Sequence, residues 1–201
     1  MLNKSLIRFI VGAVLLCGGM PSCKKSAYST QPPPSTPVIN AKLTTNASLG
    51  AVITDSAGNS LYFFSLDASG NSACTGGCLT TWPVFYTSSV ITDAGLDVKD
   101  FSSITRSDGS KQTTYKGWPL YYFQNDSKPG DVKGEGIGNI WFVAKPDYTV
   151  MLANTQLVGK DVVSYDSTYH PGAGVTHYLT DDRGVTLYSF TIDKANKNNY
   201  T

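Results

Sequence analysis

Two cysteines and two histidines carry side chains that could do chemistry in this chain. Cys74 and Cys78 are separated by three residues, and their thiols could form a disulfide, a redox pair or half of a metal site. A two-thiolate metal site needs further ligands, but His170 and His177 come far later in the chain. The spacing also differs from the Cys-x-x-Cys of thioredoxin-type motifs. In an exported protein we expect a structural disulfide, with a redox or metal role as the alternative.

Hydrolytic chemistry has weak support. A Ser/His/Asp triad needs a histidine beside a nucleophile, and His177 falls in a predicted strand, where we expect a structural role. Asp67 and Asp126 could act as paired carboxylates, but no spacing rule supports that pair. The sequence therefore favours a protein without catalytic activity, and it indicates no catalytic residue, no metal ligand and no cofactor.

The phrase Tyr-x-Phe-x-x-Asp occurs three times. Its residues are Tyr62, Phe64 and Asp67; Tyr121, Phe123 and Asp126; and Tyr188, Phe190 and Asp193. Alternate residues of a strand share a face, so each Tyr and Phe should pack together, mainly as core. An exposed aromatic platform for a ligand is the alternative. We expect each Asp to end its strand in an Asx-turn. A calcium loop is disfavoured because Gly70 and Cys78 fall at the wrong positions for one.

Strand and turn signals recur along the chain without helical periodicity. Only 15% of the residues are charged, and there are twelve tyrosines and nineteen glycines. Hairpins are predicted for residues 49–54 with 60–64, 111–115 with 120–123, and 176–180 with 185–190. We therefore expect an all-β fold, an antiparallel sheet of repeated hairpins in a sandwich or barrel-like arrangement, with essentially no helix outside the N-terminal segment.

The N-terminus is typical of a bacterial lipoprotein signal. Lys4 and Arg8 precede an apolar run over residues 9–20 that is short for a transmembrane helix. Ser22 precedes Cys23 as in a lipobox, whereas Cys17 lacks the small residue before it. We expect cleavage after residue 22 and lipid on Cys23, with an ordinary signal peptide as the alternative. Residues 23–40 are rich in Pro, Ser and Thr, so we expect them to form an extended stalk between the lipid anchor and the folded domain.

Several segments together resemble one known family. They are the three copies of the phrase, Cys74 to Cys78 with Trp82-Pro83, residues 106–121, Pro129-Gly130-Asp131, Gly134 and Trp141. This pattern resembles the secreted-repeat lipoprotein family. The resemblance covers residues 48–146 well and implies an all-β envelope protein without an established reaction. We expect a secreted-repeat β domain at 41–149 and the start of a second, incomplete repeat unit at 150–201.

The charge balance bears on possible partners. The formal net charge is +1 and no basic patch with interleaved aromatics is present, so nucleic acid is not expected as a partner. We predict a cell-envelope protein, periplasmic or surface-exposed, that is held to the membrane by its N-terminal lipid. It would be a non-catalytic module that binds a ligand or an envelope protein. Electron transfer or metal handling is the alternative, and a hydrolase is less favoured.

Overall fold

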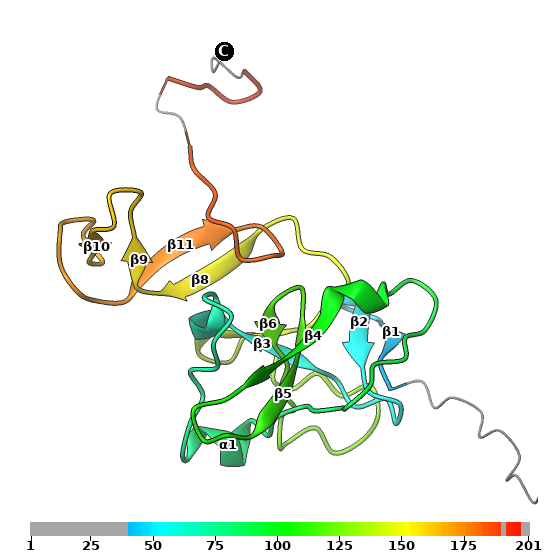
Figure 1. Cartoon of the computed structure of the whole chain (residues 1–201). Coiled ribbons are helices and arrows are strands. Elements are labelled where there is room, and N and C mark those ends of the chain that lie inside the picture. The colour runs from blue at the N-terminus through cyan, green and yellow to red at the C-terminus, as the bar shows by residue number, and fades with distance from the viewer. Residues whose placement is uncertain (1–39, 190–191, 198–201) are drawn as a thin grey trace, which may run out of the picture. The chain divides into compact units, whose positions relative to one another are not determined.

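The computed structural model describes residues 40–189 and 192–197 (Figure 1). The predicted signal segment, Cys23, the stalk up to residue 39 and Phe190 lie outside these residues. Within the described part of the chain, no helix is long and apolar enough to cross a membrane.

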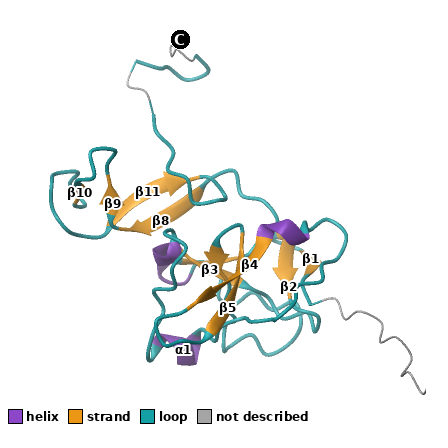
Figure 2. Cartoon of the chain, viewed as in Figure 1, coloured by secondary structure: helices purple, strands orange, loops and turns teal. Residues whose placement is uncertain are grey.

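Short strands and turns make up the described chain, and its helices are single turns (Figure 2). The strands are β1 (Lys42–Asn46), β2 (Gly50–Thr54), β3 (Tyr62–Phe64), β4 (Phe101–Thr105), β5 (Lys111–Tyr115), β6 (Trp118–Pro119), β7 (Trp141–Val143), β8 (Met151–Thr155), β9 (Leu157–Val158), β10 (Ser164–Tyr165) and β11 (Thr176–Thr180). The helical turns are α1 (Cys78–Thr81), η1 (Ser65–Asp67), η2 (Val98–Asp100) and η3 (Ile137–Asn139).

Every pairing between these strands is antiparallel. The small sheets contain β1 with β2, β3 with β7, β4 with β5 and β6, β8 with β11, and β9 with β10. The predicted all-β class, with almost no helix, is confirmed. The sheets of the described residues do not close into a barrel.

The first predicted hairpin forms only in part. Thr54 and Ser60 make one bridge, and the Leu61 amide donates to the Ile53 carbonyl at 3.0 Å. The chain then leaves its hairpin partner, and β3 pairs with β7 far along the sequence. The reason is burial: all three residues of β3 are buried, and a two-stranded hairpin cannot cover both faces of a strand.

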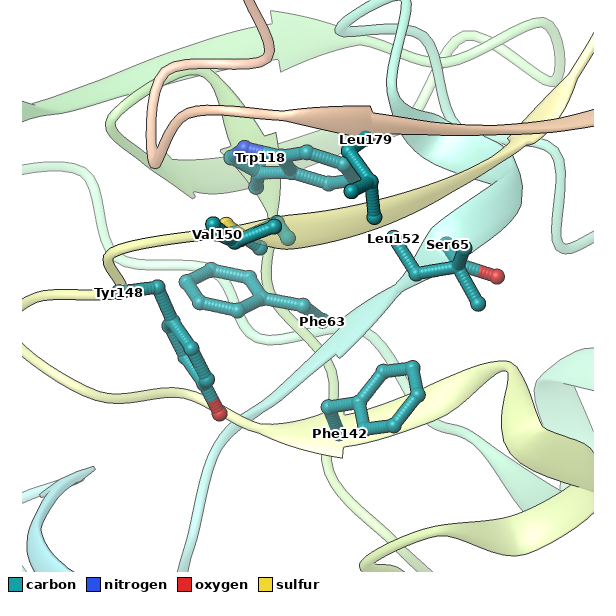
Figure 3. A pocket seen from close by; sticks show the side chains of 9 residues that line it. Phe63, Ser65, Trp118, Phe142, Tyr148, Val150, Leu152 and Leu179 are labelled. Carbon is teal, nitrogen blue, oxygen red and sulfur yellow. The ribbon is translucent and has the colours of Figure 1, made fainter. Parts of the chain in front are cut away.

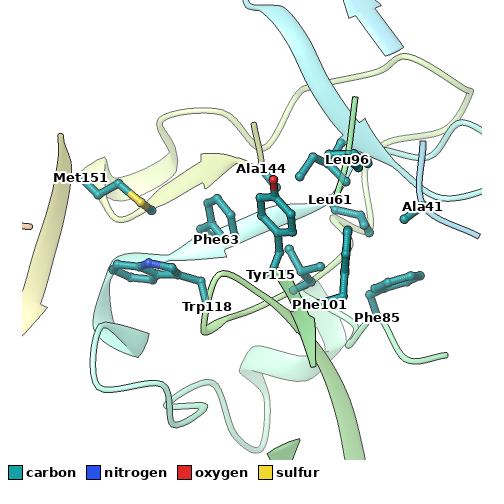
Figure 4. Close-up of a cluster of buried hydrophobic side chains, with 12 residues drawn as sticks. Ala41, Leu61, Phe63, Phe85, Leu96, Phe101, Tyr115, Trp118, Ala144 and Met151 are labelled. Atoms are coloured by element: carbon teal, nitrogen blue, oxygen red, sulfur yellow. The ribbon is translucent and has the colours of Figure 1, made fainter. Parts of the chain in front are cut away.

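Alternation along β3 divides the core into two clusters. Leu61 and Phe63 belong to one cluster, whereas Tyr62 and Phe64 belong to the other. The first cluster also contains Met151 from β8, which reaches toward Phe63 in Figure 4. The strand β3 is therefore the wall between two hydrophobic cores, one on each face.

The hairpin of β8 and β11 is held to the rest of the domain by ion pairs as well as by apolar contacts. Lys116 Nζ lies 2.5 Å from an Asp182 carboxylate oxygen and 2.8 Å from one of Asp147. Arg183 adds an ion pair with Asp100 at 2.8 Å. The turn that follows β11 is thereby tied to the turn between β5 and β6 and to the residue that precedes β4.

Candidate functional site

The first two copies of the phrase exchange hydrogen bonds with each other. The Tyr62 hydroxyl donates to Asp126 Oδ2 at 2.7 Å, and the Tyr121 hydroxyl donates to Asp67 Oδ2 at 2.7 Å. Each tyrosine thus satisfies the carboxylate of the other copy. The other carboxylate oxygens accept the amides of Ala73 and Lys133, six and seven residues further along the chain, so each aspartate joins its own loop to the tyrosine of the other copy.

The backbones of the two copies pair in the same reciprocal way. The Tyr62 amide donates to the Tyr121 carbonyl at 2.9 Å, and the Tyr121 amide returns a bond to the Tyr62 carbonyl at 3.1 Å. Tyr62 also pairs with Val143, while Tyr121 pairs with Val84. These matched contacts relate the two copies by an approximate twofold axis that passes between the tyrosines.

Four aromatic rings stack across this axis. Trp82 and Trp141 lie face to face, with ring centroids 3.9 Å apart and planes 5° from parallel. Phe64 stacks on Trp141 at 3.9 Å, and Phe123 lies against Trp82 at 4.4 Å. Each phenylalanine of the phrase therefore packs on the tryptophan of the other copy. Nothing of this stack forms an exposed aromatic platform, because all four rings are buried.

A chain of donors leads from a buried arginine to Asp67. One terminal nitrogen of Arg106 donates to the Ser72 hydroxyl, which lies 2.5 Å from the Tyr121 hydroxyl. Because the single proton of Tyr121 goes to Asp67, Ser72 must donate to Tyr121. Arg106 also donates to Gln112 at 2.5 Å. Sequence reasoning about chemistry missed these polar residues, since their role depends on contacts between distant segments.

Burial governs the protonation of this network. It raises the pKa of Asp67 to about 7, although the Ala73 amide, the Tyr121 hydroxyl and the charge of Arg106 act in the opposite direction. Burial also raises the pKa of Asp126. The pKa of the Tyr62 and Tyr121 hydroxyls lies far above the ordinary value, chiefly through burial. Both tyrosines are therefore fixed hydrogen-bond donors at any physiological pH.

The expected disulfide is present. Cys74 and Cys78 are bonded, with their Cα atoms 5.4 Å apart, within the usual range. The carbonyl of Cys74 accepts a hydrogen bond from Arg106 at 2.6 Å. The disulfide therefore helps to hold the loop that faces the Arg106 network.

The third copy has a different environment from the first two. The side chain of Tyr188 is 82% exposed, whereas Tyr62 and Tyr121 are 0% exposed. Asp193 is described, and Phe190 lies outside the described residues. The structure thus brings together six of the nine residues of the phrase and leaves Tyr188 apart from them.

The two histidines lie on the surface. Both are exposed, and the ring of His170 contacts the Thr168 hydroxyl at 3.0 Å. Among the residues that the structure describes, no three His, Cys, Asp or Glu side chains are grouped as metal ligands.

An apolar cavity of about 260 Å³ lies between the repeated copies and the β8–β11 hairpin (Figure 3). Its walls are Phe63, Ser65, Trp118, Phe142, Tyr148, Val150, Met151, Leu152 and Leu179. The Tyr148 ring is fixed by a 2.6 Å hydrogen bond from its hydroxyl to the Val143 carbonyl. No pattern in the sequence predicts this cavity, because its lining comes from five separate segments.

Replacing either buried tyrosine of the exchange with phenylalanine tests its structural role. Tyr62→Phe or Tyr121→Phe should lower the free energy of unfolding by about 1–3 kcal/mol. Tyr121→Phe removes the hydroxyl donor from the buried Asp67, and Tyr62→Phe removes it from the half-buried Asp126. Urea denaturation followed by tryptophan fluorescence measures the change. Tyr188→Phe is the matched control and should leave stability unaltered. Equal stability of all three variants would contradict the role assigned to the exchange.

The raised pKa of Asp67 predicts the pH dependence of stability. Its unfolded pKa is about 3.9, so between about pH 4 and pH 7 the folded chain binds more protons than the unfolded chain. The free energy of unfolding should therefore fall as the pH rises through this window, by at most about 4 kcal/mol, and level off above it. Asp67→Asn should flatten the decline in denaturation curves measured from pH 4 to pH 8. Asp126→Asn, at a more exposed position, should flatten it less. A decline that persists unchanged in Asp67→Asn would refute this assignment.

The comparisons with known proteins agree with the repeated geometry. A family model described as a secreted repeat of unknown function matches residues 43–86 and again 102–145. No curated protein and no solved structure matches the chain. The matched ranges carry the two copies that exchange hydrogen bonds, and each range contains one tryptophan of the central stack. With its disulfide, the repeat places the protein outside the cytoplasm. Residues 43–86 and 102–145 are therefore two copies of this secreted repeat.

Proposed function

We propose that this protein is a lipid-anchored binding module of the bacterial cell envelope, without catalytic activity, and that its ligand is a small uncharged apolar molecule. The observation that carries the proposal is the apolar cavity of about 260 Å³ between the repeat pair and the β8–β11 hairpin.

The side chains that line the cavity favour an uncharged apolar ligand. Phe63 and Trp118 lie with ring centroids 6.0 Å apart, and Tyr148 lies 6.3 Å from Phe63 on another side. Aromatic faces and aliphatic side chains favour an apolar molecule, while a charged group would be costly to bury there. A dry apolar cavity of about 150 Å³ holds benzene in another protein, so this larger cavity suits two or three fused or linked rings, or a short acyl chain.

The state of the motif residues supports a role in binding over catalysis. The carboxylates of Asp67 and Asp126 and the hydroxyls of Tyr62 and Tyr121 are engaged with one another inside the domain. Their roles are thus architectural: they build the wall of the cavity through β3.

The anchor is argued from the sequence. Cys23 follows a positively charged and then apolar segment and a small residue, and a Pro-rich stretch separates it from the first described residue. Lipid on Cys23 would hold the binding domain at the membrane surface through several acyl chains.

Filling the mouth of the cavity tests ligand binding. The uncharged fluorophore N-phenyl-1-naphthylamine should bind the full chain saturably, with increased emission. Val150→Trp, at a cavity residue that is 43% exposed, should weaken this binding at least about tenfold. Val158→Trp is the control, since Val158 is 50% exposed and lies outside the cavity. Equal binding by both variants, or none by the parent chain, would exclude the cavity as a ligand site.

Labelling cells with an alkyne-bearing palmitate tests the anchor separately. We expect the label on the parent protein and on Cys17→Ser, and its loss from Cys23→Ser, because the acylated cysteine is the one that follows the cleavage point. Retention of label by Cys23→Ser would disprove lipidation at this residue.

A further inference from the structure

We propose that the third copy of the phrase is a docking segment for a further secreted repeat whose own tryptophan strand is unpaired. The docked repeat would add that strand alongside Leu187 and Tyr188. The docking surface shares only Leu179 with the lining of the apolar cavity, and the proposal does not depend on the lipid anchor.

The third copy reproduces the local geometry of the first. In the first, the Asp55 amide donates to the Asn59 carbonyl at 2.9 Å; in the third, the Asp181 amide donates to the Val185 carbonyl at 2.9 Å. The side chains of Asp55 and Asp181 both accept amide bonds that close the same turn. The turn after β11 is therefore already folded as in a complete repeat.

The segments that follow the two turns also agree. Thr180 bridges Thr186 just as Thr54 bridges Ser60. The Leu187 amide donates to the Leu179 carbonyl at 2.8 Å, and the corresponding bond from Leu61 to Ile53 is 3.0 Å. Residues 185–187 are thus held against β11 as residues 59–61 are held against β2 in the first copy.

The first and third copies differ in the solvent exposure of their apolar residues. Leu61 and Ile53 are 0% exposed, whereas Leu187 is 44% and Leu179 50% exposed. Tyr188 is 82% exposed although Tyr62 is fully buried. A hollow of about 540 Å³ lies over this surface and is lined by Leu157, Tyr169, His177, Tyr178, Leu179, Thr186, Leu187, Tyr188 and Ser189. Apolar residues that form core in the first copy therefore form a groove in the third.

The first copy shows what covers such a groove. The Ile53 amide donates to the Ala144 carbonyl at 2.7 Å, and the Ala144 amide donates to the Leu61 carbonyl at 2.7 Å. Strand β7, which precedes Ala144, brings Trp141 and Val143 against β3. The groove of the third copy should thus bind a strand with the pattern Trp-x-Val-small. This strand would be added by backbone hydrogen bonds, as in other cases of β-augmentation.

A second copy of this chain is a poorer occupant. Its own Trp141 strand is engaged, since Trp82 and Trp141 are each only 4% exposed and stack on one another. Offering β7 in trans would disrupt the repeat pair. A further repeat whose tryptophan strand is unpaired would not have to break such contacts.

A synthetic peptide with the sequence of residues 139–146 is the direct probe, because it contains the strand that covers the first copy. It should bind the full chain with a Kd below about 1 mM and slow hydrogen exchange at residues 187–189. The same peptide with Trp141→Ala should bind at least about tenfold more weakly. On the protein, Leu187→Asp should abolish binding without changing the Tm. Val185→Asp, at a turn residue that is 61% exposed, is the control and should bind normally.

Three results would overturn the proposal. One is the absence of binding by the parent chain at millimolar peptide. Another is unchanged binding by Leu187→Asp, which would mean that the peptide displaces β7 from β3. The third is a dimer of the parent chain that Leu187→Asp abolishes, which would assign the groove to a second copy. Val150→Trp should bind the peptide normally, so a failure of this proposal is distinguishable from a failure of the cavity assignment.

Discussion

The reciprocal bonds between tyrosine and aspartate are the constraint on which the rest of the domain depends. Tyr62 donates to Asp126 and Tyr121 donates to Asp67, each at 2.7 Å. A buried polar group is costly unless it is hydrogen-bonded. The buried Asp67 of the first repeat therefore depends on Tyr121 of the second, and the buried Tyr62 hydroxyl depends on Asp126. The two repeats consequently form one domain, and neither has a complete core alone.

The same exchange sets the geometry of the hydrophobic cores. Because β3 pairs with β7 of the other repeat, the rings of Phe64 and Trp141 are brought into a stack at 3.9 Å. The opposite face of β3 turns Phe63 toward Trp118, where it lines the apolar cavity. The tyrosine–aspartate hydrogen bonds, the stack of aromatic rings and the apolar cavity therefore all depend on the pairing of the two repeats.

The third copy has the same sequence pattern, but its described residues form no strand pairing with another repeat. Its turn and bridge are formed as in the first copy, yet Leu187 and Tyr188 are exposed. Local sequence is sufficient to fold the hairpin, because its bonds lie within a few residues of each other. Burial of the motif strand is not local, since it requires a second repeat.

Four features could be predicted from the order of the amino acids alone: the all-β class, the disulfide between Cys74 and Cys78, the strand at 176–180 and the repetition of the phrase. These follow from alternation, turn residues and spacing, which are local signals. The sequence also shows that Trp82 and Trp141 occupy equivalent positions in the two repeats, because their separation equals that of Tyr62 and Tyr121. This equal spacing does not show that the two rings are in contact. The pairing of the first copy with the second, the hydrogen bonds of Arg106 and the cavity became visible only in the folded chain. Those features depend on contacts between segments that are distant in the chain, and such contacts leave no periodic signal in the sequence.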